Sequence, residues 1–144
     1  MAPRTWLLAL AALALAVTAA SGAEEVAWPE AVDYVAQHGS PSQFYGPVAK
    51  GLGLSDGGGV NYRVISRPGD PKRDFYVTDD AVVLSVTWQS GSSRGYTASR
   101  DGVLLRAMDR NRGMSLEAAA GGFKAEKAWW IATISAEKAK ARSY

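Results

Sequence analysis

Residues 81–88 read Ala-Val-Val-Leu-Ser-Val-Thr-Trp, and this stretch decides the class of fold. It is rich in β-branched side chains, which pack well on the pleated surface of a sheet. Alternate residues of a strand point to the same face. The even-numbered residues of this stretch are all apolar: Val82, Leu84, Val86 and Trp88. The stretch therefore predicts a central strand with one apolar face, and it places Trp88 in the core.

Shorter stretches on both sides of the central strand alternate with the same period. These further predicted strands are residues 60–64, 74–78, 96–100 and 103–108. Turn-forming residues separate them, since segment 67–73 holds Pro-Gly and Asp-Pro, segment 89–94 is rich in serine, and Asp101–Gly102 is a strong hairpin signal. We therefore predict a five-stranded antiparallel meander. In its last strand, every second residue is expected on one face: Val103, Leu105 and Ala107, with Leu104 opposite.

Two short helices are predicted before the sheet. Residues 29–38 begin with Pro29, which suits the first helical position because proline lacks the N–H that would go unpaired there, and Gly39 ends the segment. Residues 41–51 follow the same pattern, with a proline at the start and apolar residues at helical spacing. Residues 53–59 contain four glycines. Such a segment favours a flexible connector to the first strand.

The last segment is predicted to be a long helix that opens at residues 114–116. Apolar residues recur along one side of it at helical spacing: Leu116, Ala119, Phe123, Trp130 and Ile134. The pair Gly121–Gly122 predicts either a kink or a close approach to the sheet. The whole pattern predicts an α+β fold with N-terminal short helices, a five-stranded antiparallel meander, and a C-terminal helix packed on one face.

Residues 1–23 have the three parts of a secretory signal peptide. Arg4 gives a positive start, residues 6–17 form an apolar run, and small residues precede two glutamates. A membrane-spanning helix needs roughly 20 apolar residues, more than this run offers, so cleavage is expected rather than retention as an anchor. The cut is expected after Ala23, although small residues at 19 and 20 offer an alternative.

The mature chain, residues 24–144, has the size of a single small globular domain. It contains no cysteine. Small secreted domains of animals usually depend on disulfides, so this composition fits a Gram-negative periplasm better. We therefore expect a soluble bacterial protein that is periplasmic or secreted, without a transmembrane segment in the mature chain.

Charge is unevenly distributed along the chain. Residues 24–93 carry more acidic than basic side chains, and residues 94–144 carry more basic than acidic ones. A basic face could meet an acidic protein or anionic envelope lipids. Alternatively, the two halves pair with each other across the fold. Nucleic acid is not expected as a partner, because the chain is exported and its aromatic residues do not interleave with basic ones.

The chain has no phosphate loop, nucleophile elbow or zinc-binding pattern. We accordingly predict no catalytic residue, no cofactor and no metal, and a protein that is not an enzyme. His38, the single histidine, is expected beside the carboxyl end of the first helix. Asp70, Asp74 and Asp79–Asp80 gather around one hairpin, and paired carboxylates hydrolyse glycosides. A cell-wall or glycan hydrolase is therefore one alternative, although aspartate is also common in turns for backbone reasons.

The hairpin tip is the most distinctive loop of the chain. Residues 90–96 read Ser-Gly-Ser-Ser-Arg-Gly-Tyr. Through its first three residues and its closing tyrosine, the loop resembles the Ser-Gly-rich, Tyr-terminated loop of periplasmic lysozyme inhibitors. The resemblance implies a small antiparallel domain that inserts this loop into the active cleft of its target enzyme. The candidate binding residues of the tip are Ser90, Gly91, Ser92, Arg94 and Tyr96.

Trp129 is a further candidate binding residue. It is adjacent to Trp130, so on a helix the two side chains point about 100° apart and only one can enter the core directly. Trp129 then either covers the sheet or, with Lys124 and Lys127, meets lipid headgroups. The leading interpretation is a small exported binding or accessory protein for a periplasmic protein or envelope component.

Overall fold

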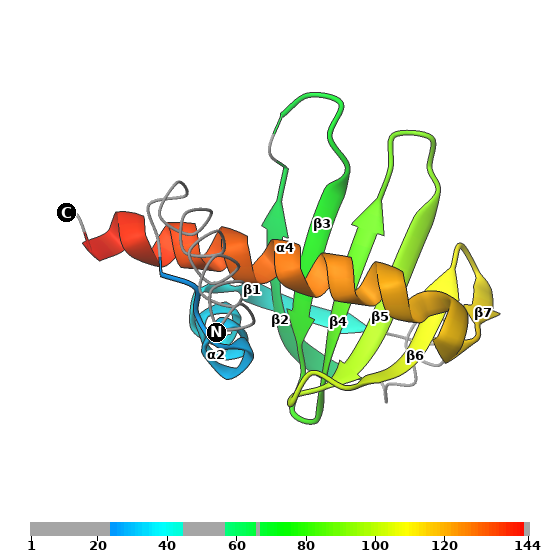
Figure 1. Ribbon diagram of the computed structural model, residues 1–144, viewed down its shortest axis with the longest axis horizontal. Coiled ribbons are helices and arrows are strands. Elements are labelled where there is room, and N and C mark those ends of the chain that lie inside the picture. Colours follow the sequence, from blue (N-terminus) through cyan, green and yellow to red (C-terminus); the bar gives the residue numbers. More distant parts are fainter. Residues whose placement is uncertain (1–23, 45–56, 66, 143–144) are drawn as a thin grey trace, which may run out of the picture.

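The computed structural model describes residues 24–44, 57–65 and 67–142. This part of the chain forms one antiparallel sheet of seven strands and two helices, which confirms the α+β class. The elements in order are helix α2 (Trp28–His38), strands β1 (Ser40–Phe44), β2 (Gly57–Val64), β3 (Lys72–Val77), β4 (Ala81–Thr87), β5 (Ser93–Ser99), β6 (Leu104–Asp109) and β7 (Arg112–Met114), and helix α4 (Leu116–Arg142). Each strand pairs with the next one along the chain, so the sheet is an open meander (Figure 1).

Helix α2 confirms the first predicted helix. A proline stands in its first turn, as expected, and its buried side faces the core. The helix ends at Gly39, whose N–H donates to the carbonyl oxygen of Val35 at 2.8 Å. A Cβ at Gly39 would lie only 2.8 Å from that same oxygen. A glycine is therefore needed where the chain leaves the helix and enters the sheet.

The five predicted strands correspond to β2–β6, and the sheet extends beyond them at both edges. Strand β1 stands where the second helix, residues 41–51, was predicted. That prediction is wrong for residues 41–44, which pair with β2 along their whole length. The proline in β1 is tolerated because an edge strand has one side without ladder hydrogen bonds. The rest of the predicted helix lies outside the described residues.

The glycine-rich segment predicted as a connector belongs in part to the sheet. Residues 57–59 are the first residues of β2. A Cβ at Gly59 would clash with the backbone carbonyl of Val77 on the neighbouring strand. The glycine therefore permits a close approach of two strands, and this correction replaces flexibility as the reason for it. Residues 53–56 of the predicted connector lie outside the described residues.

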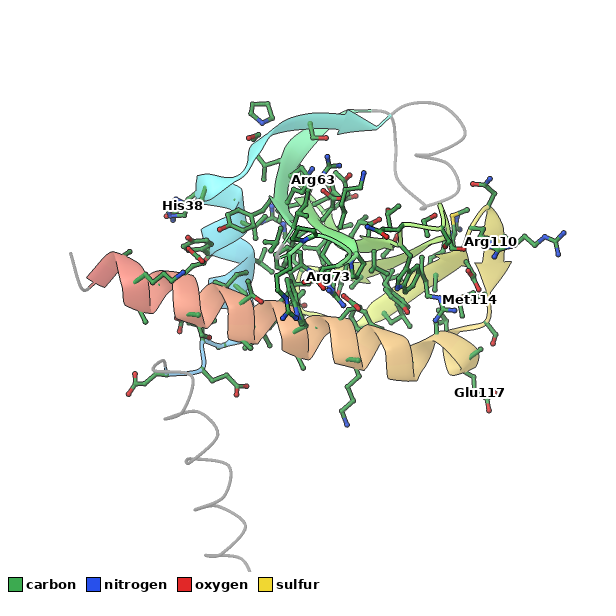
Figure 2. All side chains as sticks on the ribbon, turned by 90° about the horizontal axis from the view of Figure 1, so that it is seen from above. His38, Arg63, Arg73, Arg110, Met114 and Glu117 are labelled. Atoms are coloured by element: carbon green, nitrogen blue, oxygen red, sulfur yellow. The ribbon has the colours of Figure 1, made fainter. Side chains whose placement is uncertain are left out.

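The core lies between α4 and the sheet. Helix α4 crosses one face of the sheet, and β1 curves over the opposite face (Figures 1 and 2). Aromatic rings fill much of the space beneath the helix. The ring centroids of Trp28 and Phe75 are 5.3 Å apart, and those of Phe75 and Trp130 are also 5.3 Å apart. Tyr62 meets Trp130 edge-on at 6.2 Å.

The central strand behaves as its sequence predicts, except at its end. Val82, Leu84 and Val86 are all buried beneath α4. Trp88 is 40% exposed, so its predicted place in the core is wrong. The physical reason is that β4 ends at Thr87, which leaves Trp88 beyond the last paired residue, in the turn to β5.

A bulge reverses the predicted faces of β6. Arg106 pairs with Thr97, but Leu104 pairs with Ala98, so Leu105 is an extra residue on its strand. Beyond the bulge the alternation is shifted by one position. As a result Leu105 is exposed, as is Val103, and Leu104 packs against the core. The prediction that Val103 and Leu105 share the buried face of Ala107 is therefore wrong.

Helix α4 begins at Leu116, the last of the three residues at which it was predicted to open. Met114 belongs to β7, and Ser115 caps the helix by accepting a hydrogen bond from the N–H of Ala118 at 3.1 Å. The predicted apolar side is confirmed for Ala119, Phe123, Trp130 and Ile134, which are all buried. Leu116 is 48% exposed because it lies on the first turn of the helix, at the end of the sheet.

The two glycines of α4 mark a close approach to the sheet. A Cβ at Gly122 would clash with the hydroxyl of Tyr96, whereas a Cβ at Gly121 would meet no atom within 4 Å. The predicted signal peptide, residues 1–23, lies outside the described residues. Within the described part of the chain, none of the helices combines the length and the apolar character that crossing a membrane requires.

Candidate functional site

The β4–β5 turn presents part of the predicted tip at the surface. Ser90 and Gly91 are exposed. The turn is tight, because the N–H of Trp88 donates to the carbonyl of Ser92 at 2.9 Å and the N–H of Gly91 donates back to the carbonyl of Trp88 at 3.0 Å. Gly91 has φ of 88°, a conformation that glycine adopts readily. The tip is therefore a compact hairpin end and not a long insertion loop.

A cleft of about 820 Å³ lies between this turn and the β6–β7 hairpin. It is lined by charged, polar and apolar residues: Trp88, Ser92, Arg94, Asp109, Arg110, Asn111, Arg112, Gly113 and Met114. Two predicted tip residues, Ser92 and Arg94, are among them. Three arginines and one exposed indole thus line the same cleft.

The sheet register explains why the charged residues meet. Arg94 on β5 pairs with Asp109 on β6, and Asp109 pairs with Arg112 on β7. Nη2 of Arg94 lies 3.2 Å from Oδ2 of Asp109. Val86 belongs to the same row and is buried, so this row lies on the face of the sheet that carries α4. The cleft is therefore an extension of the core face, beyond the start of the helix.

Arg110 holds a strained position at the rim of the cleft. Its φ of 59° is in the left-handed region, which costs an L-residue other than glycine about 1–2 kcal/mol. Its N–H donates to the carbonyl of Ser93 at 2.7 Å, and its guanidinium donates to Oγ of Ser92 at 3.2 Å. These bonds tie the β6–β7 turn to the start of β5. Figure 2 shows the Arg110 side chain directed outward at the end of the molecule where Met114 and Glu117 lie.

The buried Tyr96 holds the Arg94 side chain from the core side of the cleft. The Tyr96 hydroxyl accepts a hydrogen bond from Arg94, and this bond, with the Asp109 carboxylate, raises the pKa of the guanidinium above its ordinary value. Tyr96 itself is 2% exposed and packs against Phe123 of α4, with ring centroids 6.0 Å apart. Tyr96 therefore reaches the cleft only through Arg94, and its own ring is not available to a partner.

Arg94 also has an unused donor. Its Nε is buried and has no hydrogen-bond partner among the described residues. A buried polar group of this kind is rare in native proteins and calls for an explanation.

Trp129 is not brought to the tip. It lies on the middle of α4, half-buried, with its ring 5.0 Å from that of Trp130. The guanidinium of Arg73 lies 4.5 Å from its ring centroid and is also bonded to Glu126 at 3.0 Å. The neighbouring Lys127 donates to the carbonyl of Gly102 and thus belongs to the fold. Trp129 thus meets Arg73 of β3 and packs against the core.

The four aspartates of the hydrolase hypothesis do not gather in one place. Asp74 is buried, with its Oδ1 2.8 Å from Nε of Arg63, and Asp70 pairs with Arg67 in the turn before β3. Asp80 accepts a hydrogen bond from Thr78 in the turn after β3. Asp79, in that turn, follows Asp74 by five positions of extended chain, or about 16 Å. Glycosidase carboxylates lie roughly 5–9.5 Å apart.

A second hollow, of about 680 Å³, lies at the other end of α4. Its charged lining is mostly acidic: Glu24, Glu25, Glu30, Asp33, His38 and Lys138. His38 is in the last turn of α2, as predicted, and its ring stacks on Tyr34 with centroids 4.2 Å apart. In the described part of the chain, no group of three or more histidine and carboxylate side chains could hold a metal ion.

Sequence reasoning missed most of the cleft. Arg110, Asn111 and Arg112 lie between the last predicted strand and the predicted helix, where no element and no site was predicted. The signal that could have revealed them is their position: a run of polar residues between Met108 and Met114 has the length of a hairpin turn. Trp88 was missed because its place in the apolar alternation pointed to the core.

Comparisons with protein-family models, with curated proteins and with solved structures found no match for this chain.

Proposed function

We propose that this chain is an exported binding protein that holds an anionic partner in the cleft at the β4–β5 and β6–β7 turns. The observation that carries the proposal is that Arg94, Arg110 and Arg112 line one cleft together with the exposed Trp88. Export rests on the signal-peptide pattern of residues 1–23.

The charge of the cleft favours an anion. Asp109 is the one carboxylate in its lining, and it is already paired with Arg94. Neither Arg110 nor Arg112 has an ion pair with a carboxylate in the described part of the chain. Guanidinium groups bind carboxylate and phosphate through two parallel hydrogen bonds, which gives geometric specificity as well as energy.

The rigidity of the cleft also favours binding. Arg94 is held by Tyr96 and Asp109, and Arg110 is held in a strained backbone conformation by its bonds to β5. A site whose side chains are fixed in advance loses less conformational freedom when a partner arrives. Strain at a surface turn persists where the surroundings impose it, and such residues cluster at functional sites.

Export is tested first. The full chain, with a tag at its C-terminus, is produced in a Gram-negative host, and the periplasmic product is analysed by intact-mass spectrometry. We expect a chain that begins at Glu24. A product that keeps residues 1–23 and stays in the cytoplasm would overturn the export part and leave the cleft untouched.

The cleft is tested with two variants that each lose one positive charge. Arg112→Gln removes an exposed guanidinium from the cleft, and Lys124→Gln removes an exposed ammonium from α4, away from it. The purified proteins are passed over immobilised envelope extract and eluted with rising salt. We expect the wild type and Lys124→Gln to be retained to the same salt concentration, and Arg112→Gln to elute earlier. Equal retention of all three would overturn the proposed site.

A further inference from the structure

The polar groups of the cleft are of two kinds. Arg110 and Arg112 are cations without a carboxylate partner, whereas Asp109, with its side chain 45% exposed, is an acceptor. Ser92 and Asn111 can both donate and accept. A fully deprotonated inorganic anion can only accept, so it would use the arginines and be repelled by Asp109. A ligand that carries hydroxyl groups beside its negative charge would use every one of these groups.

The apolar side chains in the lining of the cleft are those of Trp88 and Met114. Trp88 is 40% exposed although it is among the most hydrophobic side chains. An indole face is a platform for a flat or cyclic group and contributes most of its energy through the area that it covers. Acidic side chains of a peptide have no such apolar face, and their free rotation would have to be frozen on binding.

We infer that the cleft binds an acidic carbohydrate, with the carboxylate of a sugar acid against Arg110 and Arg112 and the face of the sugar ring against Trp88. The ring hydroxyls then donate to Asp109 and accept from Ser92 and Asn111. The inference rests on the proposed binding function and names the class of its ligand.

The test is calorimetric titration of the purified exported chain with tetragalacturonate at low ionic strength. The matched control ligand is the methyl ester of the same tetrasaccharide, which keeps the rings and removes the charge. We expect measurable binding of the acid and at least tenfold weaker binding of the ester, because hydrogen bonds to charged groups are stronger than those to neutral groups. Equal affinity for the two ligands would overturn the inference.

Two variants separate the charge from the ring. Arg112→Gln is expected to weaken binding of the acid roughly tenfold and to leave the weak binding of the ester unchanged. Trp88→Ala is expected to weaken acid and ester by the same factor, about fivefold. Both side chains are exposed, so the variants are expected to fold, which their melting curves verify. Lys124→Gln is the matched control and is expected to bind the acid as the wild type does.

Competing ligands test which chemical class of ligand the cleft binds. Tighter binding of tetraglutamate, or equal binding of inorganic phosphate, would overturn the carbohydrate assignment but keep an anion-binding cleft. If no probe binds while envelope retention still depends on Arg112, the ligand class is wrong and the proposed function stands. If neither depends on Arg112, the proposed function fails as well. Cosedimentation with sacculi, with tetragalacturonate as competitor, tells a wall-bound acidic sugar from a free one.

Discussion

The two ends of α4 differ in almost every physical respect. Its C-terminal half covers an aromatic cluster in which Trp130 is completely buried between Phe75 and Tyr62. Its start borders an open cleft lined by arginines. Trp130 follows the first residue of the helix by 14 positions, so the two regions are separated by about 21 Å of helix. The difference shows that one sheet can keep its stability at one end and present its charged groups at the other.

A contact that involves Gly122, Tyr96 and Arg94 links the two regions, and we call it the joint. Gly122 allows α4 to approach the hydroxyl of Tyr96, which in turn holds Arg94. This contact lies between the aromatic cluster and the cleft. Variants of the cluster, of the joint and of the cleft should therefore have different combinations of effects on stability and on binding.

The largest effect is expected in the aromatic cluster. Trp130→Ala should reduce the free energy of unfolding by about 3–5 kcal/mol, because it leaves a large cavity in the core. Trp129→Ala, at a half-buried site next to it, should cost less than half as much. Chemical denaturation measures both. Below the melting transition, both variants should bind tetragalacturonate as the wild type does, and a loss of affinity would contradict the separation of the two ends.

A substitution at the joint should change both the stability of the protein and its binding of the ligand. Gly122→Ala should destabilise the protein by about 1–3 kcal/mol, because the new methyl group overlaps the buried Tyr96 hydroxyl. It should also weaken binding, since Tyr96 holds Arg94. Gly121→Ala is the matched control: its methyl group meets open space, and alanine is the better helix former by up to about 1 kcal/mol. If both variants are equally stable, Tyr96 moves aside freely and the joint is not rigid.

A substitution in the cleft should raise the stability of the protein while it weakens binding of the ligand. Arg110→Gly relieves the left-handed conformation, and after the flexibility that glycine adds to the unfolded chain the protein should gain about 0.5 kcal/mol. The same change removes one guanidinium from the cleft and should weaken binding of the acidic tetrasaccharide. Thermal unfolding and calorimetry on one preparation measure the two effects. A variant that is less stable would contradict this prediction and show that the lost bond from the guanidinium to Ser92 outweighs the relieved strain.

The smallest effect concerns alkaline pH. Burial, and then a hydrogen bond with Tyr34, raises the pKa of Tyr62 above its ordinary value. The neutral phenol is thus favoured in the folded state, while the unfolded chain ionises near pH 10. Stability is full below pH 10 and falls as the pH rises above it. Tyr62→Phe should reduce the loss between pH 10 and 11 by a few tenths of a kcal/mol, allowing for solvent around the ring. Unfolding curves at both pH values measure this loss.

Local signals made much of the fold predictable. The alternation in 81–88, the Asp101–Gly102 turn and the helical spacing from Ala119 to Ile134 each depend on neighbouring residues alone. The helix predicted at 41–51 failed at its start because Pro41 suits a helix start and an edge strand equally well. The bulge at Leu105 left no mark in the sequence, so the faces of β6 were assigned wrongly.

The cleft was predictable only in part, because its residues meet through sheet register. Ser92 and Arg94 were found as members of one loop. Arg112 lies beside them only because β7 exists and pairs with β6, and neither fact can be read from a three-residue strand. Trp88 was placed in the core since period-2 alternation carries no information about where a strand ends.

The order of the elements has a consequence for how the chain becomes folded. Because each strand pairs with the one before it, the sheet can grow in the order in which the residues are made. Part of its apolar face nevertheless stays uncovered until residues 116–142 arrive as α4. A chain that crosses a membrane with its N-terminus first, as we propose for this one, cannot close its core before these residues have crossed. The late arrival of α4 thus keeps the chain incompletely folded during the crossing. A chain released without α4 would expose Phe75 and Leu84 to other protein chains and aggregate.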